Sequence, residues 1–128
     1  MAPATWLAVA RALRRDGLRP LILGTGAELA GFREEAGEID GAVYGDRMFG
    51  DSLRDMALSI SLAALFAGHD SCPMHIASAF GIPTLGIFAP GEPARTFPQG
   101  VGPWRIIARA SPADISAQVI MAEIGLLR

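Results

Sequence analysis

The sequence contains no lysine, and all eleven of its basic residues are arginine. This absence excludes mechanisms that need a lysine side chain, such as Schiff-base chemistry or the phosphate-binding lysine of a Walker-type loop. Thirteen acidic residues balance the arginines to a formal net charge of −2. A balance so close to neutral gives no electrostatic indication of nucleic-acid binding.

Cysteine and long apolar runs are also scarce. Cys72 is the only cysteine, so an internal disulfide is impossible and no cysteine cluster can hold zinc. A catalytic thiol at Cys72 would need His75 as its base and would lack a third member, which disfavours it. The N-terminus has no signal-peptide layout and no run approaches the length of a membrane span, so we expect a cytoplasmic protein.

What the chain does contain is typical of one soluble globular domain. It has 128 residues, enough for one core and too few for two ordinary domains. Hydrophobic residues make up 51% and charged residues 19% of the chain, and the mean hydropathy is +0.34. We therefore expect residues 1–128 to form a single domain.

Helical and strand patterns alternate along the chain. Thr5 is the predicted N-cap of a first helix that Asp16 and Gly17 end, and a final helix is predicted to begin at Ser111. The predicted strands cover residues 20–23, 42–44, 62–67, 84–88 and 105–108, and the helices between them begin near Glu28, Ser52 and Asp70. This alternation predicts an α/β, Rossmann-like parallel sheet with helices on both faces, where ligands bind at the carboxyl ends of the strands.

A polar cluster follows the apolar run 62–67 and forms the strongest candidate site. Asp70 or Ser71 is expected to cap the next helix, with Pro73 in its first turn. The unpaired N–H groups of such a helix start attract a phosphate or a carboxylate, and His75 could donate to the same anion. The alternative is that Asp70 and Ser71 only cap the helix and that His75 is a half-buried histidine without a ligand.

Two further candidates lie on the same edge of the predicted sheet. The turn Gly24-Thr25-Gly26 would let backbone approach a ligand, and Glu28 follows it; the alternative for Glu28 is ordinary helix-start electrostatics. Arg95 stands in a loop rich in proline and glycine over residues 89–100, where it could clamp a phosphate or simply be solvated. We expect this loop to lie over the site and to be its more mobile part.

Three stretches together resemble the signature of family 9 glycosyltransferases, the ADP-heptose:lipopolysaccharide heptosyltransferases. They are DSCPMHIASAFGIPT at 70–84, FAP at 88–90 and PARTFPQG at 93–100. The resemblance implies the GT-B architecture of two Rossmann-like domains, and the chain is similar to the C-terminal, donor-binding domain along nearly its whole length. It also implies that the first strand of that domain and the N-terminal acceptor domain, which carries the catalytic base, are not within these residues.

The resemblance assigns donor-binding roles to particular residues. Asp70, Ser71 and His75 would meet the diphosphate and sugar of the donor. Arg95, the candidate phosphate clamp of the loop, is predicted to bind the same donor. Cys72 stands where the family usually has glycine, whose backbone N–H reaches the phosphate. Glu28 takes the place of an acid that bonds the ribose. Phe-Ala-Pro-Gly at 88–91 replaces the family's Phe-Gly-Pro-Thr.

The predicted function is the donor-binding half of an inverting glycosyltransferase that uses a nucleotide-activated heptose and a lipopolysaccharide-type acceptor. No catalytic base, metal or cofactor is expected within residues 1–128, and a peripheral position at the inner membrane and self-association are further expectations. The alternative is a non-catalytic nucleotide- or anion-binding module that pairs with another chain.

Overall fold

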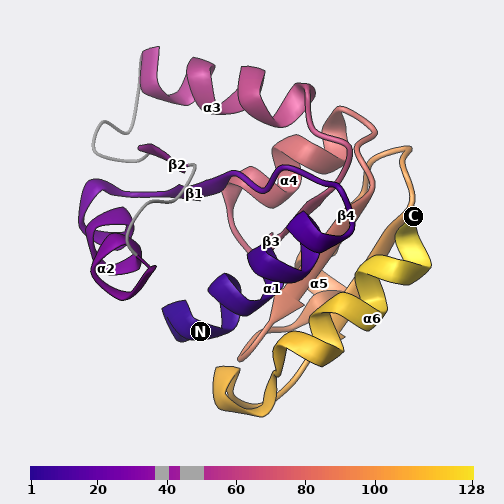
Figure 1. The fold of residues 1–128 in the computed structure, drawn as a ribbon. Coiled ribbons are helices and arrows are strands. Elements are labelled where there is room, and N and C mark those ends of the chain that lie inside the picture. Colours follow the sequence, from indigo (N-terminus) through magenta and orange to yellow (C-terminus); the bar gives the residue numbers. More distant parts are fainter. Residues whose placement is uncertain (37–40, 44–50) are drawn as a thin grey trace. The chain divides into compact units, whose positions relative to one another are not determined.

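The structure is a computed structural model that describes residues 1–36, 41–43 and 51–128. It divides into two compact units, residues 1–56 and 57–128, and each is described by itself. The elements are labelled in Figure 1. Tyr44 of the second predicted strand and the side chain of Ser52 lie outside the described residues.

The first unit contains two helices and two short parallel strands. These are α1 (Pro3–Arg15), β1 (Ile22–Gly24), α2 (Gly26–Ala36) and β2 (Gly41–Val43), followed by the start of α3 (Asp51–Ser61). Ile22 of β1 pairs with Gly41 of β2. The N–H groups of Gly17 and Leu18 donate to the carbonyls of Arg14 and Leu13, and Gly17 has a φ of +83°. This Schellman arrangement confirms the predicted end of the first helix.

The predicted start of the first helix is wrong. The helix begins at Pro3 with Ala2 as its N-cap, so Thr5 lies inside the first turn instead of capping it. The N–H of Thr5 donates to the Ala2 carbonyl at 3.1 Å. Pro3 explains the earlier start, because its fixed φ suits the first helical turn and its missing N–H needs no partner there.

The second unit is a three-stranded parallel sheet flanked by helices, as the sequence predicts. Its strands are β3 (Phe66–His69), β4 (Thr84–Phe88) and β5 (Trp104–Ala108), in the order β3-β4-β5. Its helices are α4 (Cys72–Ala79), the short α5 (Pro93–Thr96), the 3₁₀ turn η1 (Pro112–Asp114) and α6 (Ala117–Leu127). In Figure 1 the strands run between α4, which contacts β3 and β4, and α6, which contacts β4 and β5.

The third predicted strand begins later than expected. The apolar run at 62–67 contributes only its last two residues to β3, because α3 continues to Ser61 and Leu62 is 87% exposed. Leucine and alanine fill positions 62–65, and these residues favour helix over strand. The shift moves the carboxyl end of β3 to His69, immediately before the polar cluster.

The predicted start of the last helix is also wrong. Ser111 caps only η1, where its Oγ accepts from the Ala113 N–H at 3.2 Å. The chain is extended at Ile115, and Ser116 is the N-cap of α6, with its Oγ accepting from the Val119 N–H at 3.3 Å. The buried residues of α6 are therefore Ile120 and Ile124, and Ile115, also buried, lies before the helix.

Helix α4 packs closely on the central strand. Every residue of β4 is buried, and a Cβ added at Gly86 would lie 2.8 Å from the Sδ of Met74 in α4. The core of the second unit comes from α4, β4, β5 and α6 and contains Met74, Ala77, Leu85, Ile87, Phe88, Ile107, Ile120 and Ile124. This packing fixes the start of α4 at the carboxyl ends of β3 and β4. Among the described helices, none is long and apolar enough to cross a membrane.

Candidate donor-binding site

The start of α4 is tied directly to the sheet. The Asp70 N–H donates to the Ile87 carbonyl at 3.1 Å, which extends the bonding between β3 and β4 by one residue. Ser71 is extended, with φ −159° and ψ 174°, and Cys72 is the first helical residue. The helix then ends in a second Schellman arrangement at Gly81, as predicted, because the N–H groups of Gly81 and Ile82 donate to the carbonyls of residues 78 and 77.

The helix start carries no side-chain cap, which corrects the capping expected from Asp70 or Ser71. Ser71 occupies the N-cap position, but its Oγ donates to the His69 carbonyl at 3.2 Å. The Asp70 carboxylate instead accepts from the Thr96 hydroxyl. Within the described part of the chain, the N–H groups of Ser71 and Cys72 have no hydrogen-bond partner. Two adjacent donors therefore remain for an anion at the positive end of the helix dipole.

Cys72 does not need the conformational freedom of the glycine that the family usually has there. No described residue other than glycine has a positive φ, so the Cys72 backbone lies in a region open to any side chain. Its thiol is exposed and free. The backbone N–H that the resemblance assigns to phosphate binding is thus preserved.

Asp70 also brings His75 and the loop after β4 together. Its Oδ2 lies 2.7 Å from the Thr96 Oγ1, and its Oδ1 lies 3.5 Å from the His75 Nε2. The second distance is longer than an ordinary hydrogen bond, so the two side chains are neighbours without being firmly bonded. The Asp70 side chain is 31% and the His75 side chain 47% exposed, so a solute can reach both.

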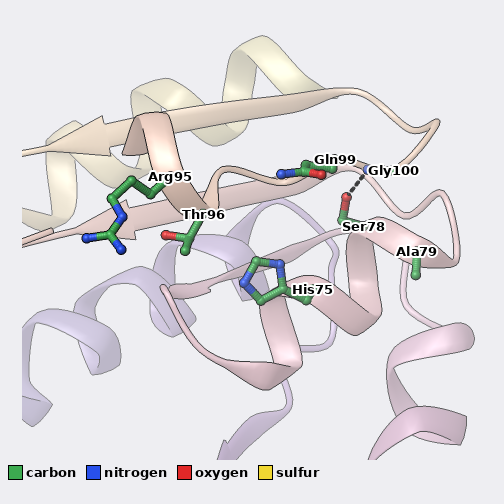
Figure 2. Close-up of a pocket in the computed structure, with 7 residues that line it drawn as sticks. All are labelled: His75, Ser78, Ala79, Arg95, Thr96, Gln99 and Gly100. Atoms are coloured by element: carbon green, nitrogen blue, oxygen red, sulfur yellow. Dashed lines mark hydrogen bonds between the residues drawn. The ribbon is translucent and has the colours of Figure 1, made fainter. Parts of the chain in front are cut away.

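A second bond holds the same loop at the other end of α4. The Gly100 N–H donates to the Ser78 Oγ at 2.6 Å, and a Cβ at Gly100 would lie 1.7 Å from the Ser78 carbonyl oxygen. Segment 96–100 therefore runs along α4, with His75 beneath it in Figure 2. Between segment and helix lies a hollow of about 390 Å³, lined by His75, Ser78, Ala79, Arg95, Thr96, Gln99 and Gly100.

Arg95 lines this hollow, and few contacts restrain its side chain. Its side chain is 79% exposed and lies 3.7 Å from the carboxylate of Glu92, which is itself 74% exposed. An exposed pair of this kind contributes little stability, so the guanidinium is available to a ligand. The structure thus brings the predicted residues Asp70, His75 and Arg95 to one place, next to the open helix start at Ser71 and Cys72.

Glu28 belongs to the first unit and has a structural role there. Its Oε2 accepts from the Thr25 N–H at 2.8 Å, while its own N–H donates to the Thr25 Oγ1 at 3.2 Å. This reciprocal pair is a capping box at the start of α2, in agreement with the helix-start alternative. A contact between Glu28 and a ribose stays a prediction.

Sequence reasoning missed Thr96, Ser78 and Gly100 as parts of the site. Thr96 bonds Asp70, 26 positions away, and Gly100 bonds Ser78, 22 positions away. No local sequence pattern predicts contacts at such separations. The only available signal was that Thr96 and Gly100 stand in the stretch that resembles the family signature. Among the described residues, no three His, Cys, Asp or Glu side chains are grouped so that they could hold a metal ion.

Solved structures of known proteins share the fold of this chain. The solved structures that match include the E. coli ADP-heptose lps heptosyltransferase II, a family 9 glycosyl transferase from Veillonella parvula DSM 2008, and the E. coli heptosyltransferase WaaC with ADP. The TM-scores are 0.78, 0.74 and 0.79 at sequence identities of 20%, 17% and 17%. The matches cover 98%, 98% and 99% of this chain but only 41%, 41% and 39% of those proteins, so the chain spans about two-fifths of their length.

The sequence comparisons give the family. A search of curated proteins finds no match. The sequence profile of glycosyltransferase family 9 (heptosyltransferase) matches residues 3–114, far more than half of the chain. With the polar cluster at the start of α4 and the shared fold, this match shows that the chain belongs to glycosyltransferase family 9, the heptosyltransferase family.

Proposed function

We propose that residues 1–128 form the donor-binding part of an inverting glycosyltransferase that takes a nucleotide-activated heptose. Family membership supports this proposal, as do the descriptions of two matched proteins, one an ADP-heptose lps heptosyltransferase and the other a heptosyltransferase with ADP. The acceptor would be of the lipopolysaccharide type and would be bound outside these residues. The proposed location is the cytoplasm, at the periphery of the inner membrane that presents such an acceptor.

One observation carries the proposal, namely that hydrogen-bond donors gather at the start of α4 and around the hollow beside this helix. The unpaired N–H groups of Ser71 and Cys72 lie at the start of α4, and His75 follows in the first turn. Arg95 lines the same hollow as His75. Backbone donors, an imidazole and a guanidinium are the groups that bind a diphosphate in proteins.

The proposed reaction places these groups on the leaving diphosphate. A carboxylate from outside residues 1–128 removes the proton of the acceptor hydroxyl, whose oxygen attacks the anomeric carbon as the bond from that carbon to the phosphate oxygen breaks. Negative charge grows on the departing diphosphate, where the helix start and His75 stabilise it. This stabilisation takes the place of a metal ion, so we propose that neither a metal nor a cofactor is required.

In this proposal Glu28 binds the ribose of the donor. Its Oε2 already accepts a bond from Thr25, and the other carboxylate oxygen is left for a ribose hydroxyl. Changing Glu28 to Gln keeps the capping box but removes the charge, whereas Glu28→Ala removes both. The two variants therefore separate the ligand role from the capping role.

Calorimetric titration of the purified chain with ADP tests the proposal. His75→Ala should weaken ADP binding by about 5- to 160-fold, the equivalent of about 1–3 kcal/mol for a charge-assisted hydrogen bond. Gln118→Ala is the matched control, because this side chain is exposed on α6 and does not line the hollow. Equal affinity of the wild-type chain and the His75 variant would remove the imidazole from the site, and no binding of ADP to the wild-type chain would contradict the proposed donor.

A further inference from the structure

One carboxylate serves two partners in the second unit. The Asp70 Oδ2 accepts a 2.7 Å hydrogen bond from the Thr96 hydroxyl, while its Oδ1 lies 3.5 Å from the His75 Nε2. A carboxylate is planar, so a short bond to one oxygen restricts rotation of the group and thereby the position of the other oxygen. The place of the Asp70 Oδ1 relative to the imidazole therefore depends on Thr96.

Thr96 is itself held by groups that are not part of α4. It is the last residue of α5, and the Phe97 N–H closes this short helix by donating to the Pro93 carbonyl at 2.9 Å. The Phe97 ring packs against Trp104 of β5, with 5.5 Å between the ring centroids, and the next residue, Pro98, is buried. The packing of Phe97 and Pro98 thus fixes the backbone that carries the Thr96 hydroxyl beside Asp70.

We propose that Thr96 is a positioning residue that, through Asp70, fixes the orientation of the His75 imidazole toward the hollow. The arrangement follows a general pattern in which a carboxylate orients a histidine and a further hydrogen bond orients the carboxylate. The Asp70 Oδ1 lies beside the Nε2 of His75 at 3.5 Å, which leaves the Nδ1 side of the ring to a ligand. The consequence for ligand binding rests on the proposed function, whereas the orientation of the ring does not.

A competing explanation is that the Thr96 bond only ties the loop to α4. In that case loss of the hydroxyl would change the stability of the chain without a specific effect on His75. The chain contains only two histidines, so nuclear magnetic resonance can follow each imidazole separately. His69 lies in β3 and serves as the internal reference.

The first experiment needs no nucleotide. Thr96→Val removes the hydroxyl at nearly constant volume and should move the ring signals of His75 but not those of His69. Thr96→Ser restores the hydroxyl and should return the His75 signals to their wild-type positions. In the Asp70→Ala background, Thr96→Val should have no further effect on His75, because the side chain that links Thr96 to the imidazole is gone.

The second experiment asks whether the orientation matters for binding. Thr96→Val should weaken ADP binding by about 3- to 10-fold, Thr96→Ser should bind as the wild type does, and Thr96→Val should add no loss in the His75→Ala background. Unchanged His75 signals in Thr96→Val would overturn the proposal, and so would equal movement of both histidines with a lowered melting temperature. If no variant binds ADP, the proposed function fails, while the His75 signals still decide the role of Thr96.

Discussion

Gly100 is the residue at which the loop after β4 makes its close contact with α4. Its N–H bonds the Ser78 Oγ, and its α-carbon approaches α4 so closely that an added Cβ would overlap the Ser78 carbonyl oxygen. Neither backbone can give way as the end of a flexible side chain does. The residue with the smallest side chain is therefore required where the loop meets the helix.

Gly100→Ala should consequently lower the free energy of unfolding by about 1–3 kcal/mol, the usual cost of overpacking a close contact. The matched control is Gly125→Ala, since a Cβ at this helical position meets nothing within 4 Å. That control should leave stability unchanged or raise it by up to about 1 kcal/mol. Urea unfolding of both variants measures the difference, and similar values for the two would mean that the loop moves away from Ser78 at no cost.

His69 makes the stability of the chain depend on pH. Burial lowers the pKa of this imidazole from its usual 6.5 because the charged form is poorly solvated. The unfolded chain therefore binds a proton at a higher pH than the folded chain does. Stability is fully present above about pH 6.5 and should fall as the pH drops below 6.5 toward the folded-state pKa.

The measurement is the free energy of unfolding at several pH values between about 5 and 8, for the wild type and His69→Gln. The free energy of unfolding of the variant should fall less than that of the wild type as the pH drops below about 6.5, because the variant has no imidazole to protonate at position 69. His75→Gln provides the comparison with a more exposed histidine. An identical pH profile for the wild type and His69→Gln would contradict a contribution from this residue.

At the scale of elements, the helices of this chain differ in which side chains accept hydrogen bonds from their first N–H groups. Helix α2 has a reciprocal capping box, and α6 has a serine cap. The starts of α1, α4 and α5 have no side-chain cap, and of these three only α4 has a serine at its N-cap position. Leaving the first N–H groups of a helix unpaired costs stability, so an uncapped start at the carboxyl edge of the sheet is consistent with a place kept for an anion.

The cap of α6 gives a test of the corrected helix boundary. Ser116→Ala should cost about 0.5–2 kcal/mol, the usual loss when an N-cap hydroxyl is removed. Ser111→Ala removes a similar bond from the three-residue turn η1 and should cost less, because fewer helical residues depend on it. Thermal unfolding of the two variants decides, and a larger loss for Ser111→Ala would favour the boundary expected from the sequence.

The loop over residues 89–100 contributes Arg95, Thr96, Gln99 and Gly100 to the lining of the hollow. Thr96 and Gly100 tie it to the two ends of α4, and Pro98 is buried. Its expected mobility stays a prediction, to be tested by hydrogen exchange with and without ADP. The two bonds imply that any such motion is concentrated before Thr96, around the exposed Arg95.

At the scale of the whole molecule, binding of the donor does not by itself give transfer of the sugar. The chain spans about two-fifths of the length of the solved structures that it matches. Holding donor and acceptor together supplies much of the rate advantage of a transferase, so a part that binds only the donor should give little or none of it.

We therefore expect residues 1–128 on their own to bind ADP without transferring sugar. The assay measures ADP release from ADP-heptose in the presence of a lipopolysaccharide-core acceptor. Reactions without acceptor and with His75→Ala are the controls. Turnover that needs the acceptor and is lost in His75→Ala would mean that an acceptor site lies within these residues.

The sequence predicted much of the fold because the signals for it are local. The apolar run at 84–88 became the buried central strand, and Gly17 and Gly81 ended their helices as expected. Boundaries failed where two local signals competed. Pro3 started a helix before Thr5, and Ser116 took the role expected of Ser111.

In the candidate site, too, local sequence predicted some features and only the tertiary structure decided others. The amino-acid sequence by itself determined the family and the polar cluster from Asp70 to His75, since both depend on residue types at short spacing. Only the tertiary structure decided what these side chains bond. Asp70 pairs with Thr96 instead of capping α4, and Gly100 closes the hollow against Ser78. Contacts between residues more than twenty positions apart depend on how the sheet places α4 beside the loop after β4, and this placement is a property of packing that no short stretch of sequence encodes.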